Sequence, residues 1–231
     1  MTRALLPAAL LLAAVATTAR AADARHPAVV ELFQAQGCSS CPPANANLMA
    51  IAGRPDVLAL AFQVTYWDDL GWKDTFARPQ FTARQWDYAR AWRRPNVFTP
   101  QVVVNGRKDG VGADPAEFRA LVRAGERGAG GPALELAAGE VRIGASAPLS
   151  RPADVWLVRY DPRILQVPVA RGENRGKTLP HRNVVRQLVR LGAWRGGAER
   201  LRVPAGGDPA WRSAVVLQLP KGGPILAAAK G

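Results

Sequence analysis

Apolar and polar positions follow different periodicities in the two halves of the chain. In the first half, short apolar runs alternate with amphipathic stretches, as strands followed by helices do. Ala28 to Phe33 is a short apolar run, and Val57 to Val64 is almost continuously apolar, as a strand buried on both faces should be. These runs predict two buried strands, with a helix between them that ends near Ala52.

Two further helices are predicted from periodicity and capping. Residues 79–92 place Phe81, Gln85 and Tyr88 on one helical face. Farther on, Asp114 precedes a proline and a first-turn glutamate, which is a strong signal for the start of a helix. The sequence therefore predicts one helix over residues 79–92 and another beginning directly after Asp114.

A hairpin is predicted between these two helices. Residues 101–104 are strand-like, and the following Asn105-Gly106 dipeptide suits a tight turn. The complete predicted order is β-α-β-α-β-β-α, which is the order of the thioredoxin fold. We therefore predict an α/β thioredoxin-like domain at residues 26–128.

The second half has the pattern of an all-β structure. Residues 125–133 are rich in glycine and predict a linker. Beyond it, strand-like runs are separated by Gly, Pro and Asp turns. These runs are a hairpin around Gly139 and the segments 153–162, 164–170, 182–191 and 211–220. We predict a β-sandwich-like domain at residues 132–231.

The first 21 residues have the pattern of a signal peptide. Arg3 is followed by a short apolar run, and Ala19-Arg20-Ala21 suits signal cleavage. The apolar run is shorter than the roughly 20 residues of a spanning helix. We therefore predict an exported protein, most simply in the bacterial periplasm, where disulfides form and persist.

The chain carries a formal net charge of +13. The excess lies mainly in residues 151–231, where 15 Lys and Arg face 5 Asp and Glu. These basic residues are scattered singly, and no nucleic-acid-binding motif accompanies them. We expect no nucleic-acid partner, whereas a weak contact with an anionic membrane surface stays open.

The only two cysteines, Cys38 and Cys41, lie in the segment QGCSSCPPAN. As a structural staple, their disulfide would close a small ring and contribute only ~2 kcal/mol. As a metal site, two thiolates fall short of the four ligands of structural zinc, although Cu(I) accepts two. As a redox couple, a cysteine at a helix N-terminus is favoured as the thiolate, and Pro42-Pro43 fit the first helical turn.

The redox hypothesis assigns a role to each cysteine and to a nearby proline. Cys38, expected nearer the surface, would attack or be attacked, and Cys41 would resolve the mixed disulfide. Thr99-Pro100 directly precedes the strand at 101–104, where thioredoxin-like proteins carry a cis proline beside the dithiol. We predict a cis bond there, with Thr99 and Pro100 shaping the substrate site.

Four segments of the chain carry a family resemblance. They are VVELFQAQGCSSCPPANANL, LAFQVTYWDDLGWKDTFARPQFTARQ, VFTPQVVVNGR and RGENRGKTLPHRNVVRQLVRLGAW. Together they resemble the secreted, thioredoxin-like family 1223 of the domains of unknown function, and the resemblance covers nearly the whole mature chain. It implies an exported thioredoxin-like domain with an appended β-rich domain and no settled activity.

The chain departs from the family pattern at two positions, and the resemblance also draws attention to one loop. Where family members have FHVDYWD, this chain has Gln63 and Thr65 in place of the His and Asp. A proton-transfer role of those two side chains therefore does not carry over. The resemblance also marks the polar loop at residues 172–183, which contains His181, as a region for binding or docking.

These observations lead to one functional hypothesis and two alternatives. We expect thiol–disulfide exchange through the C-S-S-C pair with a thiol- or disulfide-bearing protein or a small thiol, without cofactor or metal. One alternative is a periplasmic binding module that holds Cu(I) or a thiol ligand with the same cysteines. The other is a redox-silent interaction protein with a structural disulfide.

Overall fold

The computed structural model describes residues 21–231. All but the last position of the predicted signal peptide, residues 1–21, therefore lies outside the described residues. None of the helices within the described range combines the length and the apolarity that crossing a bilayer requires.

The first half contains the predicted β-α-β-α-β-β-α order, with one added 3₁₀ turn. The elements are β1 (Ala28–Gln34), α1 (Cys41–Ile51), β2 (Val57–Gln63), η1 (Asp68–Leu70), α2 (Pro79–Ala91), β3 (Gln101–Val104), β4 (Lys108–Gly110) and α3 (Pro115–Ala124).

The helix cap and the turn predicted from the sequence are both present in the structure. The Asp114 side chain accepts hydrogen bonds from the backbone N–H groups of Ala116 and Glu117, at 2.8 Å each, and so caps α3. Asn105 and Gly106 both adopt positive φ, 50° and 60°, in the turn between β3 and β4. The predicted hairpin is therefore confirmed.

The second half consists of strands. They are β5 (Leu134–Ala137), β6 (Glu140–Ile143), β7 (Ala153–Asp161), β8 (Leu165–Pro168), β9 (Thr178–His181), β10 (Val184–Trp194), β11 (Glu199–Arg202), β12 (Arg212–Gln218) and β13 (Ile225–Lys230). The sequence predicted β5, β6, β7, β8, β10 and β12 but missed β9, β11 and β13.

Strands of both halves lie in one sheet, which gives the molecule a mixed α/β fold. The order of its eight strands is β13-β12-β7-β10-β2-β1-β3-β4. The two halves meet where β10 runs parallel to β2, with Val184 opposite Ala61. There the Ala61 N–H donates to the Asn183 carbonyl at 3.0 Å, and the Asn183 side chain donates to the Ala59 carbonyl at 2.8 Å.

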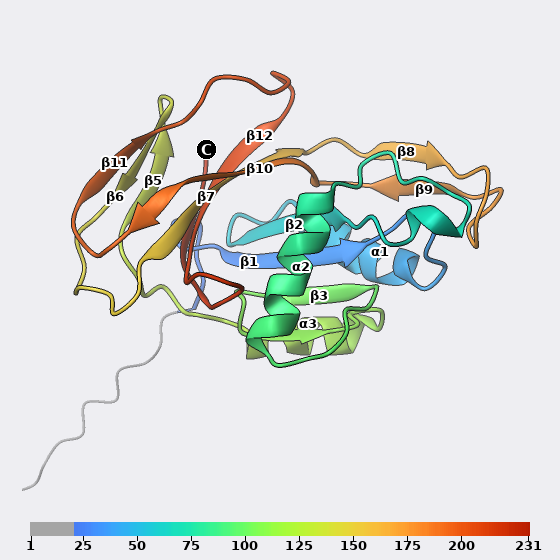
Figure 1. Ribbon diagram of the computed structural model, residues 1–231, viewed down its shortest axis with the longest axis horizontal. Coiled ribbons are helices and arrows are strands. Elements are labelled where there is room, and N and C mark those ends of the chain that lie inside the picture. The colour runs from blue at the N-terminus through green and yellow to red at the C-terminus, as the bar shows by residue number, and fades with distance from the viewer. Residues whose placement is uncertain (1–20) are drawn as a thin grey trace, which may run out of the picture.

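The helices cover both faces of the N-terminal part of the sheet (Figure 1). On one face, Leu48 of α1 and Phe118 of α3 pack with Leu32 in one buried cluster. On the other face, Phe81 and Tyr88 of α2 belong to a second cluster. The second cluster also contains residues of β7, β10, β12 and β13, so the two halves share a core.

The predicted separate β-sandwich is replaced by a different arrangement. A three-stranded sheet, β11-β6-β5, packs against the β7-β12-β13 part of the large sheet through a cluster that includes Val141, Trp194 and Leu217. Within the described residues, this is therefore the end of the molecule at which one sheet packs face to face on another. The reason is that β7, β10, β12 and β13 continue the sheet of the first half instead of closing on themselves.

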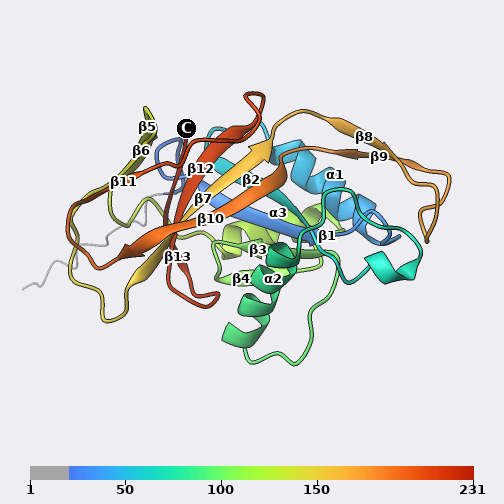
Figure 2. The same cartoon turned by 45° about the horizontal axis from the view of Figure 1, so that its top comes forward.

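The remaining strands, β8 and β9, form a two-stranded hairpin. Both views show it extending from the large sheet over the end of the molecule where α1 begins (Figures 1 and 2). We call residues 169–177, which connect β8 to β9, the hairpin tip.

Candidate functional site

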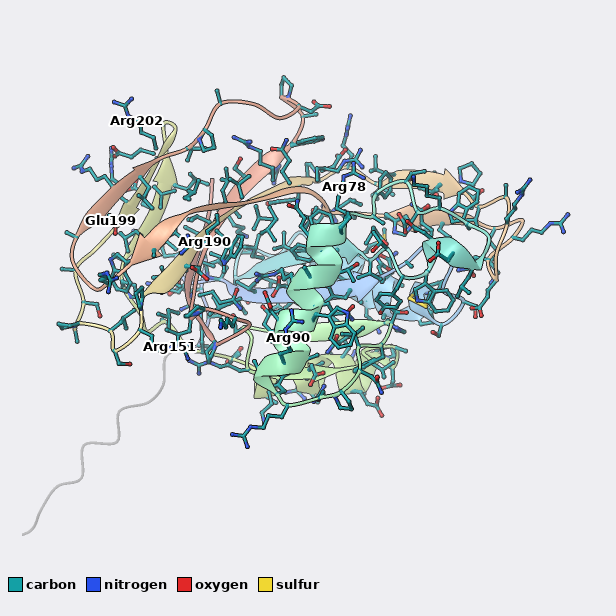
Figure 3. All side chains as sticks on the ribbon, in the orientation of Figure 1. Arg78, Arg90, Arg151, Arg190, Glu199 and Arg202 are labelled. Atoms are coloured by element: carbon teal, nitrogen blue, oxygen red, sulfur yellow. A yellow bond between two sulfur atoms is a disulfide. The ribbon has the colours of Figure 1, made fainter. Side chains whose placement is uncertain are left out.

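The two cysteines are bonded to each other at the start of α1. Cys41 is the first residue of this helix, and its Cα lies 5.5 Å from that of Cys38. The bond is drawn in yellow in Figure 3. Cys38 is 0% exposed and Cys41 is 2% exposed. The expectation that Cys38 lies nearer the surface is therefore wrong, because other segments of the chain cover it.

The predicted residues Thr99 and Pro100 lie beside the disulfide. The Thr99-Pro100 peptide bond is cis, as predicted. The Thr99 hydroxyl donates to Cys38 Sγ at 3.4 Å and accepts a hydrogen bond from Trp67 Nε1 at 2.8 Å. Ser40 Oγ lies 3.3 Å from the same sulfur. The structure thus brings together all four residues of the predicted site.

The hairpin tip covers the cysteine loop from the other side. Glu173 accepts hydrogen bonds from the Ser39 backbone N–H at 2.9 Å and from the Ser39 hydroxyl at 2.7 Å. The buried Asn174 side chain donates to the carbonyls of Gln36 and Cys38, at 2.9 and 2.8 Å. The Ser39 hydroxyl and N–H hold the pKa of Glu173 below its usual value, so this contact is made by the carboxylate.

Gly172, within the hairpin tip, lies close to the backbone of the cysteine loop. Gly172 has a φ of +77°, and a Cβ placed there would lie 3.4 Å from Trp72 Cβ and 3.9 Å from Gly37 Cα. A glycine is favoured here because the backbone is in the left-handed region and approaches the cysteine loop closely.

A buried polar network lies beneath the loop. Asp74 Oδ2 accepts from the Gln36 N–H at 2.7 Å, and Asp74 Oδ1 accepts from the Phe76 N–H at 2.9 Å. Gln36 Oε1 in turn accepts from Trp72 Nε1 at 2.9 Å. Burial raises the pKa of Asp74 to about 6, because the two N–H donors only partly offset the loss of water.

His181, at the end of β9, extends this network. The amide of Gln63 satisfies its neighbours when its nitrogen donates to Asp74 Oδ2 and its oxygen accepts from Gln34 Nε2. The amide atom that accepts from Gln34 is then also the one that faces His181 Nδ1, at 3.5 Å. This arrangement favours the tautomer with its proton on Nδ1. Gln63, one of the two positions where the chain departs from its family, therefore contacts an imidazole from a different strand.

Glu31 of β1 is held in a buried polar group on the α2 side of the sheet. Arg84 Nε donates to Glu31 Oε1 at 2.7 Å, and the Tyr88 hydroxyl donates to Glu31 Oε2. Gln218 Nε2 donates to the same tyrosine at 3.0 Å, so this buried group ties α2 and β1 to β12.

Within the described residues, no group of three or more His, Cys, Asp and Glu side chains is placed to hold a metal ion. The basic residues are spread over the molecule, and Arg175 and Lys177 belong to the hairpin tip. Figure 3 shows Arg151, Arg190 and Arg202 at the end of the molecule opposite the yellow bond.

Some site residues were missed in the sequence. Glu173 and Asn174 contact the cysteine loop, yet no motif marks them individually. The only signal for these two was the family resemblance of the 172–183 loop, because their contacts join residues 134 to 138 positions apart. Trp67, which donates to the Thr99 hydroxyl, lies in a segment that carries the family resemblance.

Fold and site together define a mixed α/β protein with a covered C-x-x-C disulfide at the start of a helix. The chain belongs to the family described as "Protein of unknown function (DUF1223)", whose model matches residues 29–218. It is also similar to a crystal structure of a protein from Agrobacterium tumefaciens, a structural genomics target. The two share 33% identity over 92% of this chain and 95% of the other, with a TM-score of 0.72. No curated protein matches the chain.

Proposed function

We propose that this protein is a thiol–disulfide oxidoreductase that acts through Cys38 and Cys41. One observation carries the proposal: the bonded pair lies at the start of α1, with the Thr99 hydroxyl 3.4 Å from Cys38 Sγ and Pro100 next to it. Helix N–H groups and this hydroxyl are donors that stabilise a thiolate formed when the bond opens.

We further propose that residues 28–124 form a thioredoxin-like unit. The support is the β2-β1-β3-β4 order, with β1 parallel to β2 and antiparallel to β3, and the placement of α1 and α3 on one face. Export to the periplasm belongs to the same proposal and rests on the signal-peptide pattern of residues 1–21.

In the proposed exchange, a thiolate attacks one sulfur of the pair and the other sulfur leaves as a thiolate. A second thiolate then resolves the mixed disulfide. A protein substrate reaches Cys38 only when the hairpin tip moves, because Glu173 and Asn174 hold the cysteine loop on that side. Exchange with proteins is therefore gated by the β8–β9 hairpin.

The competing hypothesis is a redox-silent protein in which the disulfide is structural. It is favoured by the burial of both sulfurs, since an inert disulfide needs no access. The two hypotheses predict different reduction potentials for the same bond.

The test is the reduction potential of the mature protein, measured by thiol trapping across a dithiothreitol or glutathione series. A value between about −120 and −270 mV is expected for an exchange catalyst. A value below about −300 mV would establish the structural disulfide instead. Cys38→Ser and Cys41→Ser serve as controls, because each should abolish the two-thiol redox transition while leaving secondary structure unchanged.

A further inference from the structure

The two sulfurs of the disulfide have different surroundings. Cys38 is enclosed by the Thr99 hydroxyl, by Ser40 and by the hairpin tip, whose Asn174 binds its carbonyl. Cys41 instead forms part of the wall of a cavity of about 400 Å³ between α1 and β9. The Cys41 side of the bond therefore borders a cavity, whereas the Cys38 side is enclosed.

The cavity wall is mainly apolar. Pro42, Ala46 and Met49 contribute from α1, and Leu179 and Pro180 from β9. Its polar members are Gln34, Asn45 and His181. Asn45 is already used, because it accepts from Gln34 Nε2 at 2.9 Å and donates to the Pro180 carbonyl at 2.7 Å. No Asp, Glu, Lys or Arg is among these lining residues.

Among the lining side chains within the described residues, His181 has a buried polar atom without a hydrogen-bond partner. It is 2% exposed, and its Nε2 has no hydrogen-bond partner among the described residues. Burial lowers the pKa of His181 to about 4, so the ring is neutral at neutral pH. With Nδ1 facing Gln63, the Nε2 lone pair is an acceptor that lacks a donor. A buried acceptor of this kind is costly unless a ligand supplies the donor.

We propose that this cavity binds a small, neutral, apolar thiol, which donates its S–H to His181 Nε2 and places its sulfur beside Cys41. The inference rests on the proposed thiol–disulfide exchange and names the substrate class of that same site. A thiol that carries a charged group besides its sulfur is disfavoured, because the apolar wall offers no partner for that additional charge.

The exchange balances with two ligand thiols. The first gives up its S–H proton to water as its sulfur forms a bond to Cys41 Sγ, while the Cys38–Cys41 bond breaks and Cys38 leaves as thiolate. The second attacks the ligand sulfur of the mixed disulfide and releases Cys41. The ligands are oxidised to one symmetrical disulfide, the protein pair is reduced, and the two protons given up by the thiols end on the two cysteines.

The test compares two monothiols of similar acidity, the apolar benzyl mercaptan and the anionic 2-mercaptoethanesulfonate. The rate of Cys38–Cys41 reduction is measured by thiol trapping at matched thiolate concentration. We expect benzyl mercaptan to react at least about tenfold faster and to saturate with concentration, as binding before reaction requires. Equal, unsaturated rates would overturn the inference.

Two α1 variants test whether the cavity is responsible. Ala46 and Ala50 are both exposed on α1, but only Ala46 lines the cavity. Ala46→Phe should remove the preference for benzyl mercaptan, whereas Ala50→Phe, the matched control, should retain it. If both variants keep the preference, it comes from general hydrophobicity and the inference fails.

A binding measurement separates this inference from the proposed function. Benzyl alcohol has the same shape and a hydrogen-bond donor but cannot react with the bond. It should slow reduction by benzyl mercaptan and shift the His181 Nε2 NMR resonance, and neither effect should occur in Ala46→Phe. A reduction potential below about −300 mV would contradict the proposed function. A reduction potential between about −120 and −270 mV, with no effect of benzyl alcohol on the rate or on the His181 resonance, would contradict the cavity inference alone.

Discussion

The Thr99 hydroxyl forms two hydrogen bonds: it accepts one from Trp67 Nε1 and donates one to Cys38 Sγ. The donation to sulfur is strengthened when the bond opens and Cys38 carries charge. Thr99→Val keeps the shape and removes the hydroxyl. We expect the reduced form to lose about 1.5 kcal/mol of stabilisation, which makes the reduction potential about 30 mV more negative.

Thr99→Ser is the matched control, because it retains the hydroxyl. Its potential should stay close to that of the parent when both are measured in the same dithiothreitol series. Equal potentials for the valine and serine variants would show that the hydroxyl does not act on Cys38.

The shifted pKa values of Asp74 and His181 predict opposite effects of pH on the free energy of unfolding. The folded pKa of Asp74 is raised from 3.8 to about 6, so its contribution is lost as pH rises through that range. The folded pKa of His181 is lowered from 6.5 to about 4, so its contribution is lost as pH falls through that range. Each amounts to about 3 kcal/mol at most, and between pH 4 and 6 they largely cancel.

Single variants should expose each effect. In urea unfolding between pH 4 and 7, Asp74→Asn should give a free energy of unfolding that rises with pH. His181→Phe should give one that falls with pH over the same range. Parallel profiles for the two variants would contradict both assignments.

At this scale, residue type and spacing predicted Cys38, Cys41, Thr99 and Pro100, because neighbours in sequence define a C-x-x-C loop and a proline before a strand. They could not predict that both sulfurs are buried. Burial depends on Glu173 and Asn174, whose contacts are set by the path of the chain and not by local pattern.

The tip of the β8–β9 hairpin covers the cysteine loop, and we expect it to limit access to Cys38. Asn174→Ala removes two hydrogen bonds from the hairpin tip to the cysteine loop, each of about 1 kcal/mol. We expect the disulfide in this variant to be reduced by dithiothreitol about tenfold faster or more, as followed by thiol trapping.

Arg175→Ala provides the comparison for that experiment. Arg175 is an exposed neighbour in the same hairpin tip. Its removal should leave the rate of reduction within about twofold of the parent, as expected for a surface position. If both variants react at the parent rate, the hairpin tip does not limit access.

The elements that the sequence missed have identifiable reasons. β13, Ile225–Lys230, contains three consecutive alanines, which favour strands weakly, and it is a strand because it pairs with β12. β9, Thr178–His181, contains Pro180, which argues against a strand unless the strand lies at an edge. In both cases the strand is set by pairing with the strand that directly precedes it, and not by the residue types within it.

For the whole molecule, the shared sheet predicts that the first half is not independent. A chain ending at residue 131 would leave β2 as an apolar edge and remove Tyr160, Val185 and Val216 from the core around Phe62. We expect this fragment to be poorly packed, with weak near-UV circular dichroism and strong binding of a hydrophobic dye. Cooperative unfolding with a free energy close to that of residues 22–231 would contradict this.

The glycine-rich segment at residues 125–133 predicted a boundary from composition alone. In the structure it connects α3 to β5, but Val184 of the second half pairs beside Ala61 of the first. A glycine-rich composition indicates a turn or a connecting segment. It does not indicate which strands pair across that segment, so the prediction of two separate domains missed the sheet that they share.

The hairpin tip also implies an order of events during synthesis. The cysteines are three positions apart, so their bond needs only the first part of the chain, whereas residues 172–174 emerge much later. A chain made from its N-terminus therefore presents an open cysteine loop to oxidants before its cover exists. Once the hairpin tip has folded onto the cysteine loop, we expect a protein oxidant or reductant to reach Cys38 only when the tip moves away.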